Sequence, residues 1–216
     1  MRIDMHVHTN RYSVCSKMTP QEMAHAAIRN GLDAVVITEH HYLWSIEEIH
    51  TLQEQFPALM ILRGVEVTTI EGDMLVYGIN DNTVFYEGMS LQELTSNVHR
   101  DGGIVVIAHP CRWGDEIPEA IFTAGVDGIE VMSNNVKFYM QKGIRTIKER
   151  LDCPAIATSD GHTIKALGIF ALDFQVQIDN EHDLVRAIIN RRFTIFRNQT
   201  RVDAINSKTS KRLGLL

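Results

Sequence analysis

Short runs of β-branched and other apolar residues alternate with amphipathic stretches along most of the chain, and this alternation restricts the fold more than any other feature. The runs typical of strands are 2–8, 34–38, 60–67, 74–78, 104–108, 128–132, 155–158 and 167–174. The helical patterns between them are 20–30, 45–55, 91–100, 117–124, 136–150 and 181–192. Such alternation predicts an α/β fold of βα units around a mainly parallel sheet. Periodicity alone leaves both a barrel and a doubly wound sheet open.

Some helix ends are marked by single residues. Thr19, followed by Pro20 and Glu22, predicts an N-cap with proline in the first turn. Gly31 and Gly102 follow two helical patterns where a C-terminal glycine is expected.

Composition and charge exclude several classes of protein. A chain of 216 residues fits one domain, 1–216, and a net charge of −6 provides no general basic field for a stable nucleic-acid partner. Cys15, Cys111 and Cys153 form no Cys-x-x-Cys pair, which favours a reducing compartment. We see no signal-peptide pattern, and apolar runs such as 104–108 are too short to cross a bilayer. We therefore expect a cytoplasmic protein without a membrane segment, ending in a loose tail of about ten residues.

Imidazoles and carboxylates follow the apolar runs, at the points where the strands are expected to end. They are His6, His8, His40, Glu66, His109, Glu130, Asp160 and His162. In a parallel barrel the C-terminal ends of all strands meet at one face, where active sites are built. The sequence thus predicts that six strands deliver these side chains to one rim.

The spacing of these residues favours metal coordination. His6 and His8 lie two apart, as do Asp160 and His162, so each pair can point to one side of an extended segment. Glu66 ends an apolar run, where a buried carboxylate needs either a cation or a salt bridge, for instance with Arg63.

Other residues in these segments have alternative interpretations. His109 fits a capped core histidine as well as a ligand. Asp4 is expected to orient an imidazole, and at most one of His40 and His41 to join the cluster. Mixed nitrogen and oxygen ligands suit Zn, Mn or Fe. Because the sequence has no cysteine tetrad, a catalytic cluster is a better interpretation than a closed structural zinc site.

Five of these segments together resemble the PHP (polymerase and histidinol phosphatase) family of metal-dependent phosphoesterases. They are Asp4-Met5-His6-Val7-His8-Thr9, Thr38-Glu39-His40, Gly64-Val65-Glu66, Ala108-His109-Pro110 and Ser159-Asp160-Gly161-His162. The match covers roughly residues 1–170 in the right order. The resemblance implies a distorted TIM-like (β/α)7 barrel with two or three divalent metal ions at its C-terminal rim.

The resemblance also implies a distribution of the ligands. His6, His8, Glu66 and Asp160 would hold the first ion. Glu66 would bridge to a second ion, completed by His109 and a residue of the following strand. His40 and His162 would serve a third ion.

Three positions depart from the family pattern. Glu39 stands where an aspartate is usual, and Asp73 stands where a histidine is usual, as an oxygen ligand that suits harder metals. The loop after His8 lacks the usual third-site ligand, and Cys15 is either a substitute or a plain loop cysteine.

This arrangement predicts hydrolysis of phosphate esters, with Glu66, Asp160 and Arg112 as catalytic residues. A hydroxide shared by two ions would attack phosphorus while an arginine grips the non-bridging oxygens. Arg112, Arg145 and Arg197 are the candidates, and Glu130 is expected behind the ligands or against the substrate.

The substrate stays open among nucleoside phosphates, short oligonucleotides, sugar phosphates and histidinol phosphate. One alternative is an amidohydrolase-like C–N or C–O hydrolase, in which a carbamylated lysine bridges the metals; Lys165 follows Asp160 and does not suit that role. The other is a metal-binding regulatory module without activity, which the nearly complete ligand set argues against.

Overall fold

The computed structural model describes residues 1–112, 114 and 116–203, and within them nine strands form one strongly curved sheet. The expected C-terminal tail lies outside the described residues. The strands are β1 (Arg2–Val7), β2 (Ala34–His40), β3 (Met60–Thr69), β4 (Gly72–Tyr77), β5 (Ile104–Ile107), β6 (Gly128–Met132), β7 (Ala155–Ala157), β8 (Phe170–Phe174) and β9 (Phe193–Arg197). Their order in the sheet is β7-β6-β5-β4-β3-β2-β1-β8-β9.

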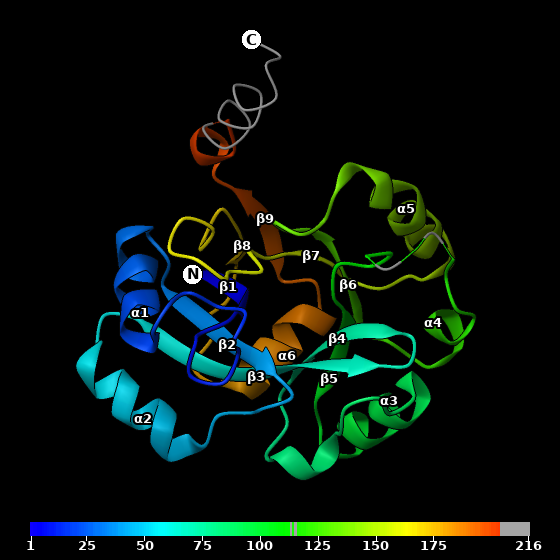
Figure 1. Ribbon diagram of the computed structural model, residues 1–216, viewed down its shortest axis with the longest axis horizontal. Coiled ribbons are helices and arrows are strands. Elements are labelled where there is room, and N and C mark those ends of the chain that lie inside the picture. The colour runs from blue at the N-terminus through cyan, green and yellow to red at the C-terminus, as the bar shows by residue number, and fades with distance from the viewer. Residues whose placement is uncertain (113, 115, 204–216) are drawn as a thin grey trace.

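Helices surround the sheet on the outside, except for one that closes its interior. They are α1 (Pro20–Arg29), α2 (Ile46–Gln55), α3 (Leu91–Arg100), α4 (Ala120–Thr123), α5 (Gln141–Arg150) and α6 (Glu181–Ile189), with short 3-10 turns η1 (Asn82–Val84) and η2 (Phe138–Met140). Figure 1 shows α1 and α2 beside β1–β3, α3 to α5 beside β4–β7, and α6 within the ring of strands. Edge strands β7 and β9 approach one another without pairing, so the sheet is a nearly closed, distorted TIM-like barrel.

The sheet is less parallel than the sequence pattern predicts. The pairs β1–β2, β2–β3, β5–β6 and β6–β7 are parallel, whereas β4 runs antiparallel to β3 and β5, and β8 to β1 and β9. Only Ile70 and Glu71 separate β3 from β4, and so short a connection permits a hairpin but no parallel crossover.

Several predicted boundaries shift for local reasons. The strand predicted at 167–174 begins at Phe170, because the backbone N–H of Gly168 donates to Asp4 instead of to a ladder. The predicted helix 117–124 is reduced to Ala120–Thr123, and 136–150 divides into η2 and α5. Strand β9 was not predicted, and its largely exposed side chains explain the weak signal.

The predicted helix ends are confirmed. Thr19 accepts from the backbone N–H of Glu22, whose carboxylate accepts from Thr19 in return, which is a capping box. Gly31 and Gly102 have φ values of 73° and 87°, a region that glycine adopts without strain.

Buried apolar side chains fill both the interior of the barrel and its outer layers. Inside, Ile3 and Met5 of β1 pack with Tyr77 of β4 and with Leu184 and Ile188 of α6. Separate clusters lie between the outer face of the sheet and the helices, one under α1 and α2 and one under α3, α4 and α5. Helix α6 therefore closes one end of the barrel and leaves the C-terminal ends of the parallel strands at the other.

No helix within the described residues is both long enough and apolar enough to cross a membrane.

Candidate metal centre

A β-bulge in β1 aims the first two histidines. Relative to β2, one extra residue of β1 lies between Asp4 and Val7, and the backbone N–H of Val7 donates to Thr38 Oγ1 at 3.1 Å. A bulge bends the strand and changes which side chains share a face. His6 and His8 consequently reach the same site, and both are fully buried.

The bulge also overturns the expectation for Asp4. Its carboxylate contacts no imidazole, because it turns toward the neighbouring loop and accepts from the backbone N–H groups of Ser159 and Gly168, each at 2.9 Å. Burial raises the pKa of Asp4 to about 6, although these hydrogen bonds oppose the shift. Asp4 thus fixes the loop that carries Asp160 and His162.

Backbone hydrogen bonds between β1 and the loop after β7 bring the two ends of the sequence motif together. The N–H of His8 donates to the carbonyl of Gly161, and the N–H of Gly161 donates to the carbonyl of His6, both at 3.0 Å. Asp160 and His162 flank Gly161 and are therefore placed against His6 and His8, more than 150 residues away in the chain.

Glu66 lies at the centre of the cluster, and its two oxygens face different histidines. Its side chain is 1% exposed, so it reaches no bulk water. The contacts are Oε2 to His6 Nε2 at 3.2 Å, His8 Nε2 at 3.1 Å and His40 Nδ1 at 3.2 Å, and Oε1 to His109 Nε2 at 2.9 Å. The alternative salt bridge with Arg63 is not formed, because Arg63 pairs with Glu181.

Asp160 faces the same nitrogens from the opposite loop. The distances are Oδ1 to His162 Nδ1 at 3.2 Å, His6 Nε2 at 3.5 Å and His8 Nε2 at 3.6 Å, and Oδ2 to His109 Nε2 at 3.9 Å. Oδ1 is buried and has no hydrogen-bond partner among the described residues. Asp160 and His109 both adopt positive φ, 47° and 25°, a strained conformation for such residues that costs of order 1–3 kcal/mol each and clusters at functional sites.

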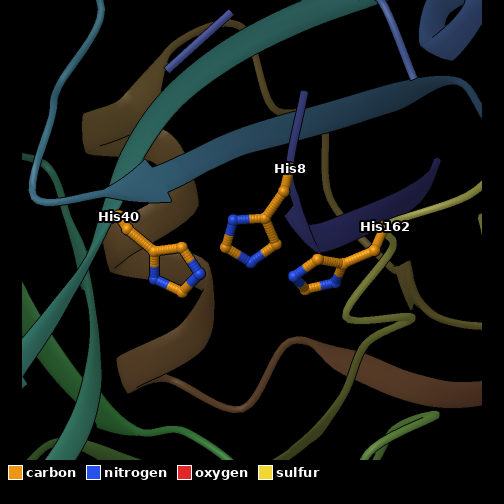
Figure 2. Close-up of side chains that lie close together, drawn as sticks. All are labelled: His8, His40 and His162. Carbon is orange, nitrogen blue, oxygen red and sulfur yellow. The ribbon is translucent and has the colours of Figure 1, made fainter. Parts of the chain in front are cut away.

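A second group of ligand atoms lies nearer to solvent. Figure 2 shows the rings of His8, His40 and His162 turned toward one another from β1, β2 and the loop after β7. The rings of His8 and His162 lie 4.3 Å apart between centroids, and those of His8 and His40 4.6 Å. Burial lowers the pKa of His40 to about 4, so this imidazole is neutral near pH 7 and has a free nitrogen lone pair.

The structure thus brings together all eight residues that the sequence suggested as ligands. They form four overlapping groups: His8, His40 and His162; His6, His109 and Asp160; His6, His8 and Glu66; and Glu66, Asp73 and His109. His41, with φ of 55°, turns away and belongs to none of these groups. Cys15 is exposed on the loop after β1.

The orientation of His6 shows that the cluster needs positive charge. Its Nδ1 lies 3.2 Å from Glu130 Oε1, and because a carboxylate only accepts, this nitrogen carries the hydrogen. In the neutral ring Nε2 then presents a lone pair, although it lies 3.0 Å from His8 Nε2 and near two carboxylates. Acceptors this close repel one another unless a proton or a metal ion lies between them.

The pKa shifts describe the same demand for a cation. Burial by itself lowers the pKa of His6, but the charges of Asp160 and Glu66 outweigh it and hold the pKa well above its ordinary value. Burial raises the pKa of Glu66 and of Asp160, yet the neighbouring histidines, His6 above all, hold both well below their usual range. The carboxylates stay ionised, and the imidazoles bind a positive charge in their midst.

These residues fit divalent metal ions. The unpartnered Oδ1 of Asp160, the convergent lone pairs and the mixed imidazole and carboxylate donors are what a transition-metal site presents. Asp73 lies at the edge of the cluster, with Oδ2 3.9 Å from His109 Nδ1 and Oδ1 accepting from Thr68 at 2.7 Å.

Behind the cluster, Glu130 contacts two of the predicted ligands. Besides His6, it accepts from the backbone N–H of His109 at 2.8 Å, from Ser133 at 3.1 Å and from the hydroxyl of Thr158. A histidine that binds a metal through one ring nitrogen is oriented by a hydrogen bond from its other ring nitrogen. Glu130 therefore fixes the orientation of the His6 ring, and through the backbone N–H it fixes the position of His109.

Arg112 is the one of the three candidate arginines that contacts a member of the cluster. Its Nη1 lies 3.3 Å from His109 Nε2. A cavity of about 610 Å³ beside Asp73 and His109 is lined by Arg112 and by apolar side chains such as Met74. Arg145 lies on α5 and Arg197 on β9, where no contact with the described cluster is formed.

Three further residues contact the site, and of these Asn135 and Ser13 were not singled out from the sequence. Asn135 donates to Asp160 Oδ2 at 2.6 Å, and the hydroxyl of Ser13 accepts from the backbone N–H of His40 at 3.0 Å. Buried Glu39 accepts from Thr9 and from Trp44 Nε1 at 3.3 Å, so it anchors the loop after β1. Ser13 and Asn135 are small polar residues in loops, and such residues carry no periodic signal that would have identified them.

Relatives are found by sequence and by structure. The chain is 25% identical over 175 residues to the uncharacterized protein MJ1587 from Methanocaldococcus jannaschii, a match that covers 71% of this chain and 97% of that protein. A two-domain protein from Bacteroides vulgatus, containing a predicted PHP-like metal-dependent phosphoesterase, superposes with a TM-score of 0.72 and 20% identity over 91% of this chain. This chain spans 64% of that protein's length.

A further similar structure is an amidohydrolase from Chromobacterium violaceum with bound SO4 and no metal. It gives a TM-score of 0.62 and 17% identity over 91% of this chain and 98% of that one. At such identities the two structures share the fold. The sequence profile of the PHP domain family matches residues 4–200, and the chain therefore belongs to the PHP domain family.

Proposed function

We propose that the protein is a hydrolase of phosphate esters that holds two or three divalent ions, of Zn, Mn or Fe. The observation that carries this proposal is the unpartnered Oδ1 of Asp160, buried among imidazole nitrogens that face one another. Four imidazoles surround one carboxylate at Glu66, and divalent ions between their nitrogens and that carboxylate would satisfy all of these groups at once.

The ligand groups suggest which residues hold each ion. His6, His8, Glu66 and Asp160 would hold the first ion, and Glu66 would share its other oxygen with a second ion at His109 and Asp73. A third ion would lie between His8, His40 and His162. Ions bound in this way would supply Lewis acidity, lowering the pKa of water and neutralising charge on phosphate oxygens.

The protein's own residues would position the ester. Arg112 adjoins His109 and faces the cavity, so its guanidinium would hold non-bridging phosphate oxygens by charge-assisted hydrogen bonds. Apolar side chains of that cavity, among them Ile117 and Ile121, would hold the part of the substrate beyond the phosphate. We expect phosphorylated small molecules or nucleotides as substrates.

An amidohydrolase-like reaction is the alternative, since one similar structure is that of an amidohydrolase. Lys165 does not suit the bridging role of a carbamylated lysine, because it is exposed, whereas Glu66 is buried at the centre of the cluster. Glu66, which belongs to two of the ligand groups, would fill the bridging position instead. We therefore place hydrolysis of phosphate esters first.

The deciding experiment measures metal content and substrate range on the same preparation. Elemental analysis should find two or three equivalents of Zn, Mn or Fe per chain, and fewer in His6→Ala. A panel of phosphomonoesters, phosphodiesters, amides and lactones should show turnover of phosphate esters, lost in His6→Ala and strongly reduced in Arg112→Ala. Turnover of amides or lactones alone would favour the alternative, and a protein that binds no metal after reconstitution would refute both.

A further inference from the structure

Two neighbouring aromatic side chains project into solvent from the loop between β6 and α5. Phe138 is 94% exposed and Tyr139 57%, in the 3-10 turn that follows β6. Single exposed rings are common, but adjoining apolar side chains on a surface mark sites of contact, and here two rings adjoin on one loop.

The loop that carries these rings is tied to the cluster itself. Asn135 donates to Asp160 Oδ2 at 2.6 Å, and Ser133 donates to Glu130. Phe138 lies three residues after Asn135, so at most about 11 Å of extended chain separates their backbones. A substrate with its ester at the cluster would extend past these rings.

The helix that follows is basic, in a chain whose net charge is −6. Residues 137–150 contain five lysines and arginines against one acidic residue, Glu149. Of these cations, Arg150 is engaged with Glu119, whereas Lys142, Arg145 and Lys148 are exposed and form no ion pair with the described carboxylates. The charge of α5 therefore suits a polyanion.

A groove lies between the end of β6 and this basic helix. It measures about 580 Å³. Val131, Met132 and Ile144 are its apolar lining, and Gln141, Arg145, Lys148 and Glu149 are its polar lining, in which two cations stand against one carboxylate. Figure 1 shows α5 near β6 and β7 at the edge of the barrel. Alternating apolar and cationic surface of this kind matches bases and phosphates of an unpaired strand.

We propose that this surface, formed by Phe138, Tyr139 and the α5 face of Lys142, Arg145 and Lys148, binds a single-stranded oligonucleotide whose terminal phosphoester enters the metal centre. Bases stack on the two rings, and the following phosphates lie against α5. The inference rests on the proposed function and names its substrate class. A duplex is disfavoured because its bases are already stacked and unavailable to the rings.

Binding without turnover tests the surface separately from catalysis. With a chelator present, fluorescence anisotropy would follow a labelled, 5′-phosphorylated oligothymidylate of about six nucleotides. The double variant Phe138→Ala/Tyr139→Ala should weaken binding by about tenfold or more, since stacking on one ring contributes about 1–3 kcal/mol per base. Phe138→Trp should retain the affinity, because indole also stacks.

The cationic face has its own readout. In Lys142→Gln/Arg145→Gln the slope of log affinity against log salt should fall by about 1.4, because each lost phosphate contact removes roughly 0.7. Matched controls lie at the closed end of the barrel: Ile189→Ala, at a position 53% exposed, and Arg192→Gln should leave both affinity and slope unchanged.

Hydrolysis of p-nitrophenyl phosphate distinguishes the two proposals, because this small ester does not reach the rings. It should be equal in all these variants. Unchanged oligonucleotide affinity in the ring variant, or preferential binding to phosphatidylserine vesicles, would overturn the inference while leaving the phosphoesterase proposal intact. Ring-dependent binding by a protein that cleaves no phosphate ester would instead refute the proposed function and support the surface.

Discussion

Both ends of the barrel bury side chains completely, but the closed end buries apolar groups and the open end buries ionisable ones. At the closed end Leu184 and Ile188 of α6 are 0% exposed and pack against Ile104 and other apolar residues of the interior. At the open end His6 and Glu66 are 0% and 1% exposed, and their neighbours are ionisable groups.

Packing at the closed end stabilises the fold by itself, whereas packing at the open end needs a bound cation to be stable. Apolar burial stabilises the closed end in proportion to the area removed from water, about 25 cal/mol per Å². Burial of carboxylates and imidazoles at the open end costs free energy unless a cation compensates it. Stability should therefore depend on the closed end, and activity and metal content on the open end.

The largest effect is expected for Asp160→Asn, which keeps the shape of the side chain and removes its charge. We expect kcat to fall on the order of 10²–10³ or more, as when one electrostatic stabiliser of a transition state is lost. Bound metal should fall in the same variant, measured by elemental analysis beside steady-state kinetics. Wild-type kcat with full metal content would show that this carboxylate has no part in the centre.

A matching change at the closed end is Leu184→Ala. Because Leu184 is fully buried, its truncation should lower the free energy of unfolding by about 2–5 kcal/mol. Urea unfolding of the metal-free protein measures this, and kcat of the folded variant should stay at the wild-type value. A changed metal stoichiometry would mean that the two ends are coupled.

Metal removal should reveal opposite pH dependences. In the metal-free protein the carboxylates outweigh burial and raise the pKa of His6, His8 and His109 above 6.5. Groups with raised pKa contribute their stabilisation fully below the unfolded value near 6.5, and lose it as pH rises through the folded values. The metal-free protein should therefore lose stability as the pH rises above about 6.5.

Metal affinity should change in the other direction, because the same imidazoles must release protons to bind an ion. Glu66 and Asp160 have lowered pKa values and do not compete in this range. At 100 times the dissociation constant a bound ion stabilises by about 2.7 kcal/mol. The shift in Tm on adding Mn or Zn, measured at several pH values, should grow with pH; a constant shift would contradict histidine ligation.

The smallest effect is expected behind the ligands, for Glu130→Gln. An amide accepts less well from His6 Nδ1 and from the N–H of His109, so activity or metal affinity should fall by about 10–100-fold. Glu119→Gln, at an exposed ion pair with Arg150, is the matched control. Equal losses in both variants would assign the effect to charge in general.

The sequence by itself indicated the alternating elements, the capping of α1 and the residues now found around Glu66. These features are local: hydrophobic periodicity, cap hydrogen bonds and spacing along one strand depend on neighbours a few residues away. The identity of the polar residues at strand ends was also sufficient to predict that they meet, because parallel strands share one C-terminal rim.

Only the tertiary structure decided how these residues meet. The bulge in β1, the hairpin that makes β4 antiparallel and the pairing of Gly161 with β1 depend on contacts between distant segments. Asn135 and the exposed ring of Phe138 were likewise recognisable only once β6 was placed beside β7. The physical reason is that strand pairing and closure of the sheet are set by the packing of the whole barrel, to which each local pattern contributes only a part.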